Sequence, residues 1–171
     1  MAPWLWYFWI YSFLGWLVEL AFAAASSGGG RRRCLLLLPL CPVYGLGMLA
    51  VLALPPMGWA ELMVFGGLAA TAAEYLYHWA GERALGVRFW DYRQVPGNLR
   101  GRVCLPFSLA WGVLVWAAVR FVQPWAQALA QAVPAPVTYA CLLVSTADVV
   151  CSLRFLRVTG DLEGMRRAGL F

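Results

Sequence analysis

The sequence predicts an all-α protein, a polytopic bundle of five transmembrane helices with its N-terminus outside and its C-terminus inside. Three observations support this prediction. Hydrophobic residues make up 63% of the 171 residues and charged residues only 12%, whereas average soluble domains have about 45–50% and about 25%. The apolar residues fall into five runs of membrane-spanning length. Finally, the arginines gather in connections that a five-span topology places on one side of the membrane.

Each span is predicted by its length, because a helix needs about 20 apolar residues to cross about 30 Å of hydrocarbon. Five segments qualify: residues 4–25, 34–54, 59–80, 103–122 and 137–153. The breaks between them contain glycines with arginines, prolines or polar residues: 28–33, Pro55-Pro56, 81–102 and Gln123-Pro124. These connections leave no room for a second domain, so we expect one integral-membrane domain over residues 1–171. We expect the first segment to be a transmembrane helix rather than a removable signal peptide, because it has no positive n-region and no clear cleavage site.

The orientation follows from the arginines. The chain has 13 arginines and no lysine, and 12 of the arginines lie in the first connection, the third connection and the tail. They are Arg31, Arg32, Arg33, Arg83, Arg88, Arg93, Arg100, Arg102, Arg154, Arg157, Arg166 and Arg167. Cytoplasmic loops carry an excess of basic residues, so we assign these three places to the cytoplasm. The remaining residue, Arg120, falls at the outer end of the fourth span, where its side chain can reach the interface.

Composition also excludes several functions. Without lysine the chain has no phosphate-binding loop of the P-loop type and no Schiff-base chemistry, so any ATP must be hydrolysed by another chain. The five cysteines have no metal-ligand spacing, and no nucleophile–base pair is readable. The arginines lie between apolar runs rather than on one face, which argues against nucleic acid. We therefore expect no metal, no cofactor and no catalytic residue.

Three carboxylates lie inside the predicted spans, namely Glu19, Glu74 and Asp148. Such residues are costly in a membrane and usually have a partner or a function. Helical rise places all three at a similar level in the cytoplasmic half of the bilayer. Each carboxylate shares a helix face with other polar residues at helical spacing, and on the third span this face also contains Tyr75 and His78. The candidate ligand-binding residues of a site open to the cytoplasm are Glu19, Glu74, Asp148, Tyr44, Tyr75 and His78. Alternatively, the acids are structural and pair between helices, and His78 is merely interfacial.

The second span contains Pro39 and Pro42, neither of which can donate a helical hydrogen bond. We expect its inner half to be kinked or unwound, with freed carbonyls near Tyr44. Alternatively, these prolines simply begin the helix.

Several motifs are similar to those of a known family. They are YSFLGWLVE from Tyr11, PLCPVYGLG from Pro39, Glu74-Tyr75, Phe89 to Tyr92, Asn98, Gly101 to Cys104 and Trp111-Gly112. Together they resemble the ABC-transporter type IV permease family of small bacterial membrane proteins, over about residues 8–124. The chain departs from the family pattern at Leu38, at Phe89 and in the arginines of the first connection. The resemblance implies a permease-like, multi-pass protein of the bacterial inner membrane. It implies no substrate and no catalytic residue.

We therefore predict a permease-like component of a transporter that works in the lipid bilayer with partner chains. At 171 residues the chain is small for a complete transport path, so we expect a homo-oligomer or a separate ATPase subunit. The cytoplasmic connection would be the docking surface, and its candidate residues are Trp90, Asp91, Asn98 and Arg102. Two alternatives remain: a membrane-embedded enzyme or binding protein for lipid headgroups, and a structural or assembly subunit.

Overall fold

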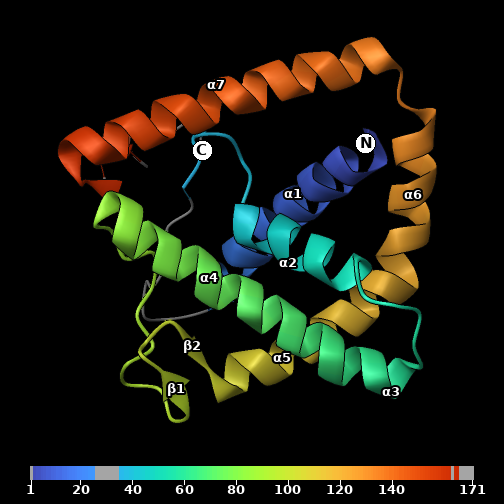
Figure 1. Cartoon of the computed structure of the whole chain (residues 1–171), viewed down its shortest axis with the longest axis horizontal. Coiled ribbons are helices and arrows are strands. Elements are labelled where there is room, and N and C mark those ends of the chain that lie inside the picture. The colour runs from blue at the N-terminus through green and yellow to red at the C-terminus, as the bar shows by residue number, and fades with distance from the viewer. Residues whose placement is uncertain (1, 26–34, 163, 166–171) are drawn as a thin grey trace.

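The computed structural model describes residues 2–25, 35–162, 164 and 165. The described residues are mostly helical, as predicted, and they include one short antiparallel hairpin (Figure 1). In chain order the elements are α1 (Ala2–Ala25), α2 (Pro42–Leu52), α3 (Trp59–Glu61), the π-helical turn η1 (Leu62–Gly66), α4 (Gly67–Leu85), β1 (Asn98–Leu99), β2 (Val103–Cys104), α5 (Leu105–Ala117), the π-helical turn η2 (Ala118–Val122), α6 (Gln123–Ala132) and α7 (Ala135–Thr159).

Among the described residues, three helices are long and apolar enough to cross a membrane: Ala2–Ala25, Leu105–Ala132 and Ala135–Thr159. At a rise of 1.5 Å per residue, even the shortest of them exceeds the thickness of the hydrocarbon core. The first and last correspond to the first and fifth predicted spans, and the last extends beyond the predicted 137–153 at both ends.

The second predicted span is only partly helical. Of residues 34–54, helix α2 covers Pro42–Leu52, and the described part that precedes it, residues 35–41, is not helical. Both readings of the prolines apply here, because Pro42 begins the helix and the chain before it is unwound. The backbone of this unwound segment is paired nevertheless. The amide of Leu40 donates to the Leu38 carbonyl and that of Cys41 donates to the Ser12 carbonyl of α1.

The third predicted span is helical from Trp59 and continues past residue 80 to Leu85. The predicted break at Gln123-Pro124 is wrong, because the helix that begins at Leu105 continues through this dipeptide to Ala132. In a regular α-helix the ring of Pro124 would clash with the carbonyl four residues earlier. The wider π-helical turn η2 lies immediately before the proline and accommodates it. The chain changes direction there, so that α6 lies across the end of the bundle beside α1 (Figure 1).

The core is formed where α1, α2, α4 and α5 meet. It contains Tyr11, Met48, Val51, Ala70, Trp111 and Val115. Helices α4 and α5 approach closely at a pair of glycines, since a Cβ on Gly67 would lie 3.0 Å from the Cα of Gly112. Small residues of this kind allow membrane helices to gain packing contacts without a hydrophobic driving force between them.

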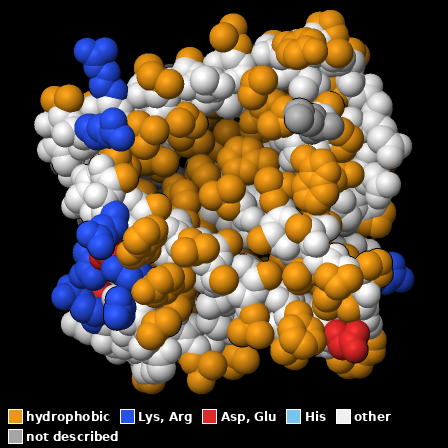
Figure 2. Space-filling model, in the orientation of Figure 1, with side chains coloured by type: hydrophobic (Ala, Val, Ile, Leu, Met, Phe, Trp, Pro, Cys, Tyr) orange, Lys and Arg blue, Asp and Glu red, His pale blue; other side chains and the backbone are white. Residues whose placement is uncertain are grey.

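Helix α7 lies along one edge of the bundle (Figure 1). Near its beginning Thr138 accepts a hydrogen bond from Trp6 Nε1 of α1, at 3.0 Å, and near its end Leu156 packs on Val87 and Phe89. Between these contacts lies a cavity of about 360 Å³. Figure 2 shows a hollow with orange hydrophobic side chains on this face. The residues that line the cavity are Trp6, Trp9, Leu38, Pro39, Leu40, Ala140, Cys141, Val144 and Ser145.

Candidate functional site

Glu19 lies near the end of α1 with only 8% of its surface exposed, and its Oε1 accepts a hydrogen bond from the Tyr44 hydroxyl of α2 at 2.7 Å. The tyrosine reaches it by crossing α1 at Gly15, one helical turn earlier. A Cβ at Gly15 would overlap the Tyr44 ring, so the position needs a residue without a side chain. The motif YSFLGWLVE therefore supplies both the acid and the space for its partner.

Glu74 is fully buried on α4, and both of its carboxylate oxygens accept hydrogen bonds from aromatic residues. Trp111 Nε1 of α5 donates to Oε2 at 2.8 Å, and the hydroxyl of Tyr92, in the connection after α4, donates to Oε1 at 3.3 Å. The ring of Tyr44 packs on Trp111 with 4.9 Å between centroids. The structure thus brings Glu19 and Glu74 into one network, in which the Tyr44–Trp111 ring pair joins the two carboxylates.

A cavity of about 230 Å³ lies beside this network, between α1, α2 and α5. Among the described residues of its lining Glu19 is the charged one, and the rings of Tyr44 and Trp111 form part of its wall. The described residues that line it are Val18, Glu19, Phe22, Tyr44, Phe107, Ala110, Trp111 and Leu114. This cavity therefore combines one carboxylate with four aromatic side chains.

Asp148 of α7 has a different environment. Its Oδ1 accepts hydrogen bonds from the backbone amide of Leu37 at 3.0 Å and the Ser152 hydroxyl at 2.9 Å, while Oδ2 accepts the backbone amide of Leu38 at 2.9 Å. Non-helical backbone at membrane depth requires such partners. The structure therefore places Asp148 with the unwound 35–41 segment, whereas Glu19 and Glu74 lie together around the Tyr44–Trp111 pair.

His78 is fully buried on α4, one turn after Glu74, and its ring meets Trp90 edge-on with 4.8 Å between centroids. Its Nε2 lies 3.5 Å from Glu82 Oε1. Glu82 in turn accepts hydrogen bonds from Arg88 at 2.6 Å and from Arg102 at 2.7 Å. Burial by itself raises the pKa of Glu82. The hydrogen bonds from the two arginines lower this pKa by a larger amount, so its net value is about 2. Glu82 therefore pairs with arginines of the connection.

The remaining candidate residues form hydrogen bonds and ion pairs that stabilise the connection 86–104. Arg102 donates to the Tyr75 hydroxyl at 2.7 Å, which ties the connection to α4, and its carbonyl accepts a hydrogen bond from Trp90 Nε1 at 2.6 Å. Asp91 pairs with Arg93, whose hydrogen bonds lower the Asp91 pKa to about 2. Asn98 closes the hairpin: its Oδ1 accepts a hydrogen bond from the Gly101 amide, and its Nδ2 donates one to the Val95 carbonyl.

Sequence reasoning did not identify the partners of the buried acids. Trp111 and Tyr92 belong to the motifs of the family resemblance, but nothing in their spacing relates them to Glu74. The sequence spacing did indicate part of the cavity wall. Phe22 follows Glu19 by three residues, and Phe107 and Trp111 are four apart, so each pair shares a helix face.

No curated protein and no solved structure matches the chain. A family sequence model does match it, and the match covers residues 6–153, most of the chain and all of the network described above. The chain therefore belongs to the family described as "Putative ABC-transporter type IV", and it is a membrane protein of a transporter type.

Proposed function

We propose that this protein is a permease-like subunit of a transporter in the bacterial inner membrane, with five membrane crossings and a polar site reached from the cytoplasm. The family membership and the three long apolar helices support the transporter context. The two further crossings are the unwound segment with α2, and residues 59–80 of the continuous helix Trp59–Leu85, whose last turn extends beyond the membrane.

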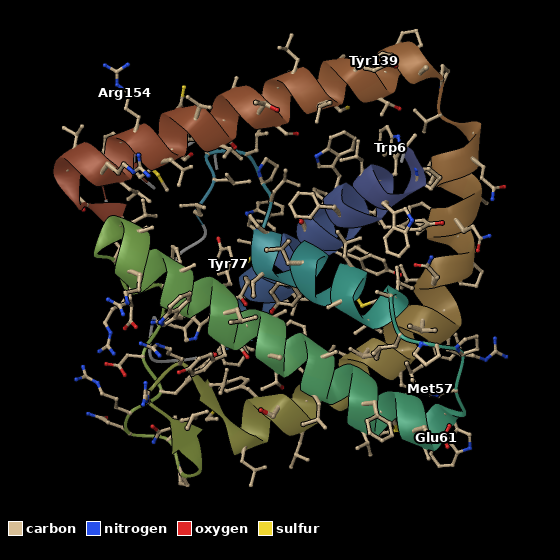
Figure 3. All side chains as sticks on the ribbon, viewed as in Figure 1. Trp6, Met57, Glu61, Tyr77, Tyr139 and Arg154 are labelled. Carbon is tan, nitrogen blue, oxygen red and sulfur yellow. The ribbon has the colours of Figure 1, made fainter. Side chains whose placement is uncertain are left out.

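The directions of the helices support a topology with the N-terminus outside and the C-terminus inside. Helices α1, α4 and α7 run one way and α2 and α5 run the opposite way (Figure 1). Basic side chains gather at one end of the molecule in Figure 2, the end at which Arg154 lies in Figure 3, while Glu61 and Tyr139 lie at the other end. An excess of arginine at one end assigns that end to the cytoplasm.

Helix α6 fits this topology as an interfacial helix on the outer side. Ala126 and Ala130 face inward and are buried, while Trp125, Gln127 and Gln131 are exposed. A helix that is apolar on one face and polar on the other, and lies across the ends of the crossings, suits the membrane surface.

The observation that carries the proposal is the position of Tyr92. This residue belongs to the cytoplasmic connection, yet its hydroxyl bonds to the buried Glu74, which bonds to Trp111 in the cavity wall. A displacement of the connection by a docked ATPase would therefore move a direct partner of the buried network. This arrangement supplies the mechanical link that a transporter subunit needs between its energy source and its site.

The surface of this connection suits an acidic partner. Arg88, Arg93 and Arg100 are exposed there, and Arg83 is exposed beside it in the last turn of α4. The internal pairs of Asp91, Asn98 and Arg102 hold the backbone of the connection. Preorganised surfaces of this kind lower the ordering cost of docking.

The test is purification from native membranes in mild detergent, with mass spectrometry of the proteins that remain bound. We expect a stoichiometric ATP-hydrolysing subunit, and we expect its loss in an Arg83→Glu, Arg100→Glu double variant. Arg120→Glu, in η2, is the control and should retain the partner. Recovery of lipid without an ATPase would overturn the proposal.

A second candidate, a structural or assembly subunit, is favoured by one observation. Glu74 and Asp148 have both carboxylate oxygens hydrogen-bonded to protein donors, which is how intramembrane acids stabilise helix contacts. Glu19→Gln and Glu74→Gln distinguish the candidates, since lost transport in a folded protein supports a site, and failed assembly supports structure. An anionic lipid headgroup is not favoured, because the 230 Å³ cavity has a carboxylate and no arginine in its described lining.

A further inference from the structure

The cavity between α1 and α7 has walls that the protein's own contacts hold in place. Trp6 and Trp9 of α1 meet edge-on with 5.2 Å between ring centroids, and the 3.0 Å hydrogen bond to Thr138 fixes the Trp6 indole. On the other side, Asp148 of α7 binds the backbone of the unwound segment 35–41, part of which lines the same cavity. The cavity of about 360 Å³ is therefore preformed, because hydrogen bonds join the elements that surround it.

The described side chains of this lining offer contact to hydrocarbon. They are two indoles, two leucines, a proline, an alanine, a valine, Cys141 and Ser145. The hydroxyl of Ser145 donates to the Cys141 carbonyl of the preceding turn of α7 at 2.6 Å, so its proton is used within the helix. A water molecule in a cavity needs two to four polar partners, whereas a methylene group needs only close contact. These walls therefore suit an alkyl group better than water.

The volume of the cavity suits an alkyl chain and is too small for a helix of a partner. A helix with its side chains is about 10–12 Å wide and rises 1.5 Å per residue, so each residue occupies about 120–170 Å³. The cavity would hold only about two to three such residues. An apolar cavity of about 150 Å³ binds benzene, which has six carbons. In proportion, a cavity of 360 Å³ holds about 14 carbons, which is comparable to the length of a lipid acyl chain.

The cavity opens toward the lipid of the membrane. Val144 of its lining is 54% exposed, and Figure 2 shows the hollow on this face of the molecule. Helices α1 and α7, which form two of its sides, are both long and apolar enough to cross a membrane. Its α7 residues, 140–145, lie about 8–15 Å from the beginning of that helix. In the proposed topology this depth falls in the outer half of a hydrocarbon core that is about 30 Å thick.

From these observations we propose that the cavity between α1 and α7 binds an acyl chain of a phospholipid from the outer leaflet of the membrane. The acyl chain lies against Trp6 and Trp9 and fills the space between α7 and the unwound segment. It supplies there the close packing that protein interiors have elsewhere, so bound lipid should also stabilise the fold. This inference goes beyond the proposed transport function and requires only that α1 and α7 cross the membrane.

The experiment counts the lipids that remain bound to the full chain. The protein is extracted from native membranes in mild detergent, washed until lipid no longer leaves it, and weighed by native mass spectrometry. We expect about one phospholipid per chain, because the cavity has the volume of about one acyl chain. The absence of bound phospholipid, or a free fatty acid in its place, would overturn the proposal.

Substitutions that fill the cavity locate the lipid. Val144→Phe and Ala140→Phe each add a ring to the lining and should lower the retained lipid at least about fivefold, because a ring and an acyl chain cannot share one volume. Both positions are exposed, so the fold should tolerate the larger side chain. Leu143→Phe is the matched control, since Leu143 is 73% exposed on α7 outside the described lining, and this variant should retain the lipid. Equal retention in all three variants contradicts the proposal.

A stability measurement separates the acyl chain from the headgroup and from a second copy of the protein. Adding dimyristoyl phosphatidylcholine to the lipid-free protein should raise the thermal midpoint of unfolding, because a ligand that binds the folded state stabilises it. Glycerophosphocholine, which has the same headgroup without acyl chains, should not raise it. Val144→Phe should lose the response to lipid and Leu143→Phe should keep it.

Three results of this measurement would contradict the proposal: an equal response in these two variants, a response to glycerophosphocholine, or a native dimer that Val144→Phe dissociates. If phospholipid is retained but no ATPase co-purifies, this inference stands and the transporter proposal fails.

Discussion

Replacing Asp148 with asparagine should release the unwound segment before α2. In the native protein the two carboxylate oxygens accept the backbone amides of Leu37 and Leu38 at 3.0 and 2.9 Å. Asparagine has one oxygen and one amino group, so one of these amides would face a second donor instead of an acceptor. The substitution keeps the size of the side chain, which confines its effect to charge and hydrogen bonding.

The magnitude follows from the bonds that are lost. A hydrogen bond to a charged group contributes about 1.5–3 kcal/mol, and an unpaired buried donor costs about 1–3 kcal/mol. Taking about 2 kcal/mol for the net loss, local opening of the segment should become about 30-fold more populated, because each 1.4 kcal/mol is a factor of about ten.

Hydrogen exchange of the Leu37 and Leu38 amides, measured in nanodiscs, tests this reasoning. We expect exchange about 30-fold faster in Asp148→Asn. Ser152→Ala is the control: it removes a hydroxyl donor from the same carboxylate and leaves both amide bonds in place, so exchange at these two amides should change less than about fivefold. Native protection in Asp148→Asn would refute the assignment of this acid to the unwound segment.

Three further predictions follow from the same contacts. Trp111→Phe removes the indole that donates a hydrogen bond to the fully buried Glu74, so it should lower the free energy of unfolding in an SDS titration by about 1–3 kcal/mol. Trp116→Phe, on the same helix but without a bond to that carboxylate, is the control, and an equal loss in this variant would contradict the prediction. Gly15→Val should overlap the tyrosine ring that crosses α1 and lower the thermal midpoint of unfolding, and an unchanged midpoint would contradict the close approach. Glu82 should stay ionised well below its ordinary pKa of 4.5 and titrate near pH 2. Its ion pairs should therefore contribute their full stability above about pH 4.5 and lose it as the pH falls toward 2. A ¹³C carboxyl titration with a midpoint near 4.5 would show that the arginines do not lower the Glu82 pKa.

Much of the fold was predictable because membrane insertion depends on local composition. The first and fifth predicted spans lie within α1 and α7, since an apolar run of that length has to be helical to satisfy its own backbone. The non-helical chain before α2 was also predictable, because Pro39 and Pro42 act on the backbone directly. The helix through Pro124 was not, because the π-helical turn that accommodates the proline has no sequence pattern of its own.

The intramembrane acids show where sequence reasoning ended. Their cost in a bilayer singled out Glu19, Glu74 and Asp148 from the sequence alone. Which of them share a site depended on donors distant in the chain: Asp148 binds amides 110 and 111 residues away, and Glu74 binds an indole 37 residues away. Composition and periodicity report the free-energy cost of burying a charge and the helix face on which it lies. The partner that compensates that cost is set by how the helices pack, and only the tertiary structure determines this.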